Sequence, residues 1–377
     1  MTVSITPCRA RAAIVAGLAI AAFAALAPAG AGAQALLDRS VRTGPQVVSY
    51  KIDAADPRTI TQFAFPIAIA VPLFNRLSID VATAYAKVTY DSASFNGKID
   101  GLTDTQVRAS YTLGSDNVVF TMGLNLPTGQ ESVDFVTQGA AAGQIGNDFL
   151  AFPISNMGTG FAGTGGVAVA RAAGSWNVGV GASFRRSVQF EPFDAASLGG
   201  NRVRFQPGDE YRFRAGVDRG VGPGSLALGV TYYMFGNEDF GPTTYSTGDR
   251  VLGQVGFARP MGPATLALAA WDLYHMKGAL GDSSAAPKEN IANVGLSLGF
   301  RAGDRARIEP NVEYRRWTMD GESAGTLGLY GLRARMDSGR WALVPSVSLA
   351  SGSMTPFGST ASDGLSGWRG MLTIQWR

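Results

Sequence analysis

The sequence has 377 residues, with 32 Lys and Arg against 29 Asp and Glu, and 49 of its residues are glycine. The near balance of charge argues against a nucleic-acid partner, and the glycine excess favours tight turns and crowded walls. The only cysteine, Cys8, precedes the apolar N-terminal run. Its removal with that run would exclude disulfides, thiolate metal sites and a cysteine nucleophile.

The N-terminus is typical of a secretory signal peptide. Arg9 and Arg11 form a basic region, residues 12–27 are apolar, and small residues follow. We therefore predict a signal peptide at residues 1–33, with 35 as the alternative cleavage position, and a periplasmic lead at residues 34–45. No later apolar run reaches the roughly 18 residues that a membrane-spanning helix needs, which excludes a helical membrane protein.

From residue 46 onward, short stretches alternate between apolar and polar residues and are separated by turn-forming residues. This period of two predicts β-strands, because successive side chains point to opposite faces. The predicted strands are 46–53, 60–73, 77–90, 105–113, 117–127, 166–172, 176–188, 209–218, 225–234, 250–259, 264–275, 290–300, 306–318, 327–335, 341–350 and 368–377. The pattern predicts an all-β fold, an antiparallel transmembrane β-barrel over residues 46–377 with about 16 strands, or about 14 if the first two do not span.

Short and long connections alternate along the chain. The short turns at 74–76, 114–116, 173–175, 219–224, 260–263, 302–305 and 337–340 are expected on the periplasmic side. The longer loops at 91–104, 128–163, 189–207, 236–248, 276–289, 320–325 and 353–366 are then extracellular. A soluble sandwich or propeller is disfavoured, because no second layer is present to cover the apolar rows.

The last strand has one apolar face, made by Trp368, Gly370, Leu372, Ile374 and Trp376. Aromatic residues at both ends of such a face are typical of strands that cross an outer membrane. The stretch resembles the C-terminal targeting signal of bacterial outer-membrane proteins, although Arg377 follows its final aromatic residue. We expect these five residues to face outer-membrane lipid and to contact the barrel-assembly machinery.

Two features interrupt the regular pattern. Pro66 and Pro72 lie within one predicted strand, which predicts irregular pairing, a wall kink or a small opening, since proline cannot donate to a ladder. The loop 128–163 is the longest stretch without a strand pattern and carries Phe135, Phe149 and Phe152. Such a loop either folds into the pore as a plug or stays outside with its own small cluster.

Arginine dominates the positions that the alternation places inside the barrel. The candidate lumen or selectivity residues are Arg108, Arg185, Arg212, Arg214, Arg250, Arg301, Glu309, Glu313, Arg333 and Arg335, and Asp80, Glu210, Asp218, Arg307, Arg315 and Arg369 share that face. They would form either a cross-strand ladder of ion pairs that stiffens the wall or an electropositive constriction that favours anions.

Catalytic and cofactor signals are sparse. His275, the only histidine, stands near Asp272, and no second feature supports a catalytic triad. Metal-binding loops, phosphate-binding glycine loops and histidine clusters are not found in the sequence. We expect no enzymatic activity, no cofactor and no metal.

Two segments carry a family resemblance. Residues 123–130 read Gly-Leu-Asn-Leu-Pro-Thr-Gly-Gln and residues 101–105 read Gly-Leu-Thr-Asp-Thr. Over residues 46–190 the sequence resembles the outer-membrane proteins linked to meta-pathway phenol degradation, a family related to the long-chain fatty-acid transporters. The resemblance implies uptake of small hydrophobic or aromatic molecules. Fatty-acid transporters carry an N-terminal plug, whereas only about ten residues precede the first strand here, so loop 128–163 would have to close the pore and the Pro66 strand would be the place for a lateral opening.

The sequence therefore predicts a Gram-negative outer-membrane channel for passive uptake of small hydrophobic or aromatic solutes. A general diffusion porin with anion preference is the first alternative. A structural or adhesive barrel with a closed lumen is the second.

Overall fold

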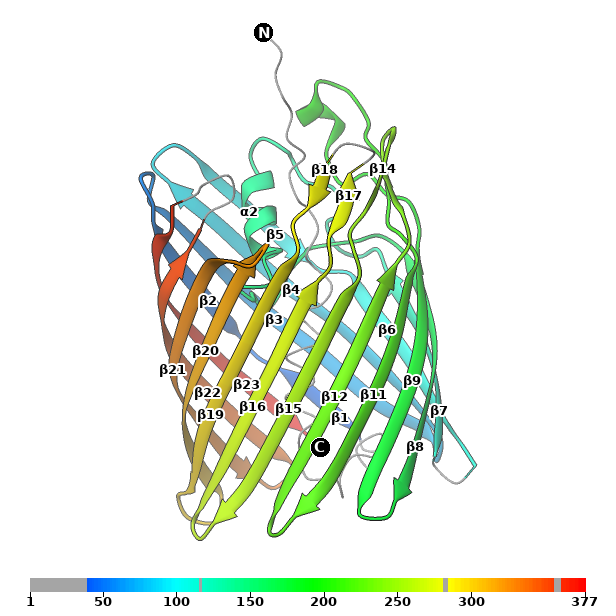
Figure 1. The fold of residues 1–377 in the computed structure, drawn as a ribbon, viewed down its shortest axis with the longest axis vertical. Helices are drawn as coiled ribbons and strands as arrows, with labels where there is room; N and C mark the ends of the chain where they lie inside the picture. The colour runs from blue at the N-terminus through cyan, green and yellow to red at the C-terminus, as the bar shows by residue number, and fades with distance from the viewer. Residues whose placement is uncertain (1–38, 115–116, 281–283, 356–360) are drawn as a thin grey trace.

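The computed structural model describes residues 39–114, 117–280, 284–355 and 361–377 (Figure 1). The predicted signal peptide, its cleavage positions and Cys8 lie outside the described residues, as do residues 115 and 116 of one predicted turn. In the part of the chain that is described, no helix is long and apolar enough to cross a membrane.

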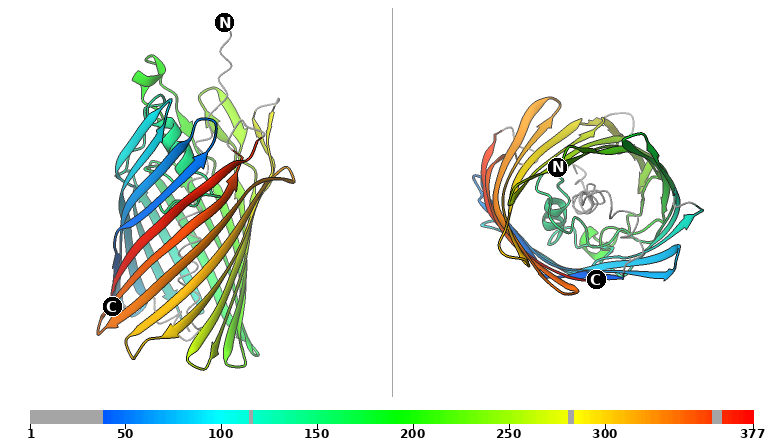
Figure 2. Two further views of the ribbon diagram at one scale, coloured as in Figure 1. Left: turned by 90° about the vertical axis from the view of Figure 1, so that its left-hand side faces the viewer. Right: turned by 90° about the horizontal axis from the view of Figure 1, so that it is seen from below.

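The described strands form a closed antiparallel barrel, seen end-on in the right-hand view of Figure 2. The main sheet has 18 strands. Two pairs of short strands share one place each in the wall. Strands β1 (Ser40–Thr43) and β2 (Gln46–Asp53) both lie between β23 (Asp363–Trp376) and β3 (Arg58–Phe74). Strands β5 (Asn96–Leu102) and β6 (Thr105–Leu113) both pair with β4 (Leu77–Ser92). The barrel therefore has 18 − 2 = 16 positions, which confirms the predicted fold and strand count.

Most wall strands begin and end within three residues of the predicted bounds. They are β1 Ser40–Thr43, β2 Gln46–Asp53, β3 Arg58–Phe74, β4 Leu77–Ser92, β5 Asn96–Leu102, β6 Thr105–Leu113, β7 Val118–Leu126, β8 Ala162–Ala173, β9 Trp176–Ser187, β11 Glu210–Val221, β12 Gly224–Phe235, β15 Arg250–Met261, β16 Ala264–His275, β19 Glu289–Arg301, β20 Ala306–Met319, β21 Glu322–Ser338, β22 Trp341–Met354 and β23 Asp363–Trp376. Strands β8, β21 and β23 begin four or five residues earlier than predicted, and β22 ends four residues later. The loops add helix α2 Gly139–Ile145, the 3-10 helix η2 Ala195–Leu198, and five short strands, β10 Phe205–Gln206, β13 Glu238–Phe240, β14 Thr243–Ser246, β17 Gly278–Leu280 and β18 Ser284–Ala286.

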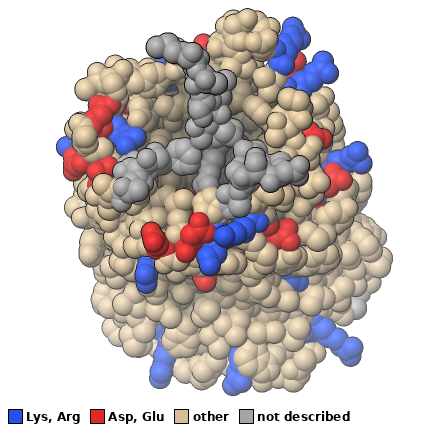
Figure 3. All heavy atoms as spheres, turned by 45° about the horizontal axis from the view of Figure 1, so that its top comes forward, with Lys and Arg blue, Asp and Glu red and all other residues tan. Residues whose placement is uncertain are grey.

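The period-two pattern sorts the side chains as expected. On β3, Phe63 is 36% exposed and Ile69 is 39% exposed on the outer face, whereas Gln62 and Ala64 on the inner face are fully buried. Figure 3 shows the charged side chains gathered around one rim, with a wall below it that is largely free of them. An apolar outer surface of this extent suits lipid rather than water.

The closing strand β23 completes the ring. It pairs with β22 on one side and with β1 and β2 on the other, so that Trp376 lies opposite both Trp341 and Val41. Trp368, at the other end of the outward row, is 43% exposed. The first and last strands of the barrel are therefore neighbours in one continuous wall.

Two differences from the predicted organisation concern wall strands. The wall begins at Ser40, within the predicted lead, because residues 40–43 pair with both neighbours of β2 in the same register. The predicted loop 91–104 contains β5, since β4 extends to Ser92 and offers residues 85–91 as a pairing edge. The glycine and asparagine content of that loop concealed the strand in the sequence.

The proline-containing strand is only locally irregular. Pro66 pairs with Ala84 in an unbroken β3–β4 register, and a register shift follows at Pro72. The interruption lies in the neighbouring strand, at Gly44 and Pro45 between β1 and β2. Gly44 has φ +136°, and a Cβ added there would lie 1.9 Å from a carbonyl oxygen of Leu372.

At the end of the barrel that carries the long loops, β10, β13, β14, β17 and β18 form a second small sheet (Figure 1). The opposite end, near the C-terminus, has the short turns. The short turns and the long loops therefore lie at opposite ends of the barrel, as their alternation along the chain predicted.

Candidate functional site: a loop inside the barrel

The segment between β7 and β8, predicted as loop 128–163, enters the barrel. The right-hand view of Figure 2 shows the helix α2 within the ring of strands. Ile145, Phe149, Leu150 and Phe152 are at most 1% exposed and belong to the same buried cluster as wall residues. Of the two predicted placements for this loop, the structure has the inner one.

Two aromatic contacts fix the loop against the wall. Phe149 stacks on Trp317 of β20 with ring centroids 5.4 Å apart, and Phe152 meets Tyr50 of β2 edge-on at 5.5 Å. Aromatic pairs at such distances add about 1 kcal/mol each beyond the area they bury. The third predicted aromatic residue of the loop, Phe135, lies elsewhere, edge-on to Phe193 of another loop at 5.2 Å.

Arginines from the wall bind the backbone of the loop. Arg315 donates from Nη1 to the carbonyl oxygen of Phe149 at 2.6 Å. Arg369 donates from Nη2 to the carbonyl oxygen of Leu150 at 2.9 Å, and the Tyr50 hydroxyl donates to the same oxygen at 3.3 Å. Hydrogen bonds from charged donors are about twice as strong as neutral ones, so these contacts hold the loop firmly.

Further contacts flank this point. Gln62 of β3 forms a reciprocal amide pair with Ile154, with distances of 2.6 and 2.9 Å. On the other side, the carboxylate of Asp148 lies 3.7 Å from Nε2 of His275 on β16. Residues 148–154 thus follow the inner wall from β16 to β3.

The Asp148 side chain lies in the barrel interior and is 8% exposed. The pKa of Asp148 is raised to about 6, chiefly by burial and also by Glu289, while Arg250 and Arg315 lower it. The carboxyl group therefore titrates close to neutral pH.

The two ends of the loop meet at one buried carboxylate, Asp104, in the break between β5 and β6. Its oxygens accept hydrogen bonds from Asn125 Nδ2 at 2.8 Å, from the Gly129 amide at 3.2 Å and from the Thr159 amide at 2.6 Å. Asn125 also donates to the carbonyl oxygen of Gly160 at 2.7 Å. This set of residues, the loop anchor, satisfies buried polar groups that would otherwise be costly.

The loop anchor joins the two segments that carry the family resemblance. Asp104 comes from residues 101–105, whereas Asn125 and Gly129 come from residues 123–130. Gly129 has no room for a side chain, because a Cβ there would lie 2.0 Å from the carbonyl oxygen of Met157. The two short motifs thus hold the end of the loop next to its beginning.

The predicted lumen residues divide into two groups. Arginines within 4.0 Å of a carboxylate are Arg108 with Asp80, Arg212 with Glu210, Arg315 with Glu313, Arg333 with Glu309 and Arg335 with Asp337. Among the described residues, Arg185, Arg214, Arg250 and Arg301 have no carboxylate at that distance. Arg335 pairs with Asp337 of its own strand, β21. Among the described ion pairs, Arg333 with Glu309 is therefore the one that links β20 to β21 as predicted.

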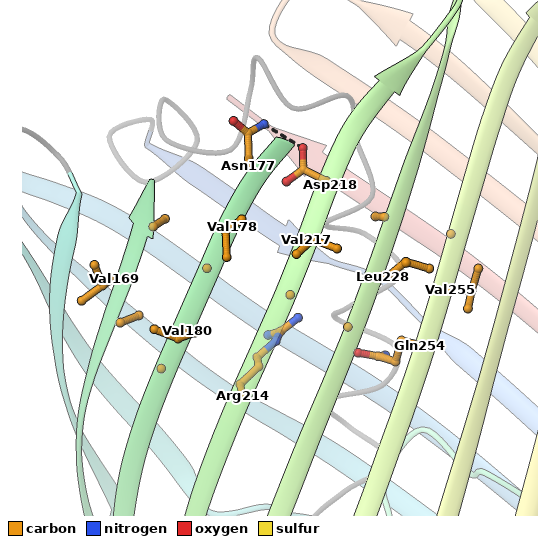
Figure 4. Close-up of a pocket in the computed structure, with 18 of the residues that line it drawn as sticks. Val169, Asn177, Val178, Val180, Arg214, Val217, Asp218, Leu228, Gln254 and Val255 are labelled. Atoms are coloured by element: carbon orange, nitrogen blue, oxygen red, sulfur yellow. Dashed lines mark hydrogen bonds between the residues drawn. The ribbon is translucent and has the colours of Figure 1, made fainter. Parts of the chain in front are cut away.

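In one part of the inner wall, most inward positions are occupied by glycine or alanine. On β8, β9, β11, β12 and β15, a hollow is lined by Ala168, Ala170, Gly179, Gly181, Gly216, Ala227, Gly229 and Gly256. Its polar groups are Arg214, Gln254 and a 2.9 Å hydrogen bond from Asn177 to Asp218 (Figure 4). Small side chains here leave space on the side of the lumen that residues 148–154 do not line.

Several site residues were not predicted from the sequence. They are Tyr50, Gln62, Asp104, Asn125, Asp148 and Trp317. The inward parity of Tyr50 and Trp317 was a usable signal, because two large aromatic residues facing a supposedly polar lumen require a partner. Asp148 gave no such signal, since its position depends on the path of the loop.

No protein-family model matches the sequence, and no curated protein matches it. Similar solved structures include the TodX monoaromatic hydrocarbon channel deltaS2 mutant, 8% identical with TM-score 0.49 over 90% of this chain and 90% of that chain. The CymD monoaromatic hydrocarbon channel is 9% identical with TM-score 0.43 over 92% of this chain and 90% of that one. OmpT of Vibrio cholerae is 9% identical with TM-score 0.43 over 90% and 98%. At these identities the likeness is one of fold alone.

The prediction that the chain is not an enzyme is withdrawn. It rested on the lack of a second group beside His275, and the structure brings Asp148 there, whereas Asp272 faces outward and bonds Asn290. OmpT is among the similar barrels together with hydrocarbon channels. A fold shared by different proteins excludes no activity.

Proposed function

We propose that this chain is an outer-membrane channel for passive uptake of small hydrophobic or aromatic molecules, inserted after loss of its signal peptide. Residues 148–154 would form the constriction. The apolar outer wall supports a membrane location, and the closed 16-strand ring supports a channel.

The observation that carries this proposal is the apolar interior beside the loop. Inward positions of the wall strands include Val48, Ile52, Ile60, Val88 and Leu327, all at most 1% exposed and packed with the loop. A water-filled porin has a polar interior. The loop covers these side chains, and the inner surface left open to a solute is the hollow lined by small residues such as Ala168, Gly179 and Ala227. A mainly apolar hollow next to a constriction favours solutes that partition out of water.

The test is deletion of residues 139–158 in the full mature barrel. Removal of the constriction should raise single-channel conductance in a planar bilayer severalfold and abolish selectivity for toluene over an uncharged sugar in vesicle uptake. Deletion of residues 195–200 in another loop is the matched control and should change neither. Unchanged conductance after the first deletion would contradict the proposed role of the loop.

A general porin with anion preference is the second candidate. The observation that favours it is the group of inward arginines without a close carboxylate, such as Arg214 and Arg301. Large ohmic conductance of the unaltered protein, indifferent to toluene, would support this candidate over the first.

A further inference from the structure

A transverse row of inward side chains crosses four neighbouring strands at the loop-bearing end of the barrel. Arg212 of β11 lies opposite Tyr233 of β12, Tyr233 opposite Arg250 of β15, and Arg250 opposite His275 of β16. Because directly opposite residues on antiparallel strands share a face, the four side chains form one continuous row. Phe235, two positions beyond Tyr233, shares that face.

Arg250 is the most unusual member of this row. It is 5% exposed, and its guanidinium lies over the Phe235 ring, 5.1 Å from the centroid. Within the described residues, no carboxylate lies within 4.0 Å of it, and its Nε has no hydrogen-bond partner. A buried guanidinium without an ion pair is costly to keep, and the ring contact offsets only part of that cost.

Arg212 approaches the same aromatic pair from the other side. Its Nη2 donates to Glu210 at 2.6 Å, while its Nε is buried without a partner. The guanidinium lies 4.9 Å from the Tyr233 ring centroid. The rings of Tyr233 and Phe235 are nearly parallel, at 8°. Two stacked aromatic rings thus stand between two guanidinium groups that each keep an unused N–H.

Apolar side chains pack next to the row. Leu252 and Leu273, both 5% exposed, form a buried cluster with Tyr233, and Phe235 and Trp271 pack against it. The nearby acidic groups are Glu210, which is paired with Arg212, Asp148, which meets His275 and interacts electrostatically with Arg250, and Glu289, which lies opposite His275 on β19. The region therefore combines cationic donors with buried apolar side chains, and Arg212 and Phe235 are half-buried.

We propose that this row binds a small aromatic carboxylate, an inference that rests on the proposed function and names its substrate class. The carboxylate accepts hydrogen bonds from Arg250 and Arg212, and the aromatic ring packs against Tyr233, Phe235 and Leu252. Arginine suits this role because its planar fork matches carboxylate geometry. An uncharged aromatic compound leaves Arg250 unpaired, and a small aliphatic acid leaves the aromatic surface uncovered.

The experiment measures binding of benzoate, acetate and benzyl alcohol to the full mature barrel in detergent micelles by calorimetry. Benzoate should bind at least about tenfold more tightly than either other compound. Arg250→Gln should weaken benzoate binding about tenfold or more, and Arg250→Lys, which keeps the charge without the fork, should fall in between. Arg186→Gln is the matched control, because Arg186 lies at the same end of β9 with its side chain exposed on the outer face.

Three results would overturn the proposal. They are equal benzoate affinity in the Arg250→Gln and Arg186→Gln variants, equal affinity for benzoate and acetate, and tight binding of benzyl alcohol. If Arg250→Gln fails the heat-shift test for folded barrels on SDS gels, Tyr233→Leu replaces it and should remove the preference for benzoate over acetate. Benzoate binding without solute flux would support this binding site and refute the proposed channel. Solute flux without benzoate binding would support the channel and refute this site.

Discussion

Buried charged and polar side chains of the wall hold the inserted loop chiefly through its main chain. Main-chain carbonyl or amide groups of residues 149–154 form hydrogen bonds with Arg315, Arg369 and Gln62. Because every residue has such groups, the sequence of the loop gave no indication of these contacts. Phe149 and Phe152 add aromatic packing with Trp317 and Tyr50.

The carboxyl group of Asp148 should make retention of the loop depend on pH. Its pKa in the folded protein is about 6, above its usual value of 3.8, so the folded state holds its proton more tightly than the unfolded chain does. Stability is then highest below about pH 4 and falls as pH rises to about 6, by on the order of 3 kcal/mol. Asp148→Asn should remove this dependence.

The check is the temperature at which the barrel loses its fast mobility on SDS gels, measured at pH 4.5 and pH 7.5. The Asp148→Asn variant should be more heat-resistant than the parent at pH 7.5 and similar to it at pH 4.5. Asp134→Asn, a half-buried acid of the same segment, serves as control. A parent protein that is more stable at pH 7.5 than at pH 4.5 would refute the role of Asp148.

At the level of elements, two breaks in otherwise regular strands distinguish this wall. One lies between β1 and β2 at Gly44, and the other lies between β5 and β6 at Thr103 and Asp104. The second break shifts the register on β4 by one residue, from Tyr85 opposite Leu102 to Ala82 opposite Gln106. This shift is characteristic of a β-bulge, a device that re-aims side chains, and here it places the Asp104 carboxylate at both ends of the loop.

Asp104→Asn should release the ends of the loop, because the amide cannot accept every hydrogen bond that the carboxylate accepts. Loss of charged hydrogen bonds at a buried site costs about 2 kcal/mol or more. Chymotrypsin cleavage after Phe149 in the folded barrel should accelerate about tenfold or more. Asp100→Asn, on the outer face of β5, should leave the rate unchanged, and equal rates in the two variants would disprove the anchoring role.

Strands with a clean period of two could be predicted from sequence, and β23 is the clearest example. The strand β5 was missed because Asn96, Gly97 and Gly101 are poor strand formers, and its pairing depends on the length of β4. In the sequence, the residues of the loop anchor could be recognised only as parts of the two motifs at 101–105 and 123–130, with no indication of their role. Their meeting depends on a contact between residues 104 and 159, which no local pattern encodes.

For the whole molecule, the inward charges near the short turns bear on ion selectivity. Arg333 is paired with Glu309, yet 52% of its side chain is exposed, and Arg335 is 34% exposed beside Asp337. Changing Arg333 and Arg335 together to Gln should shift the reversal potential toward cation preference, with about a twofold or larger change in permeability ratio. An unchanged potential would favour the role of a wall-stiffening ladder.

The matched control for that measurement is Arg219→Gln with Arg259→Gln. Both arginines lie near the same end of the barrel but face outward in the register, and Arg219 covers the ring of Trp176. They carry the same charge change without contact with the lumen.

The position of Leu150 also constrains the order of folding. Its carbonyl oxygen accepts from Tyr50 on β2 and from Arg369 on β23, and Arg369 in turn donates to the Tyr50 hydroxyl at 2.6 Å. These strands are neighbours only after the first and last segments of the chain have joined. The final hydrogen bonds of the loop therefore form after ring closure, a slow step that unites distant parts of the sequence. A barrel trapped before closure would retain most of its strands and still have a loose interior segment, so protection of the loop from proteolysis would report completed assembly.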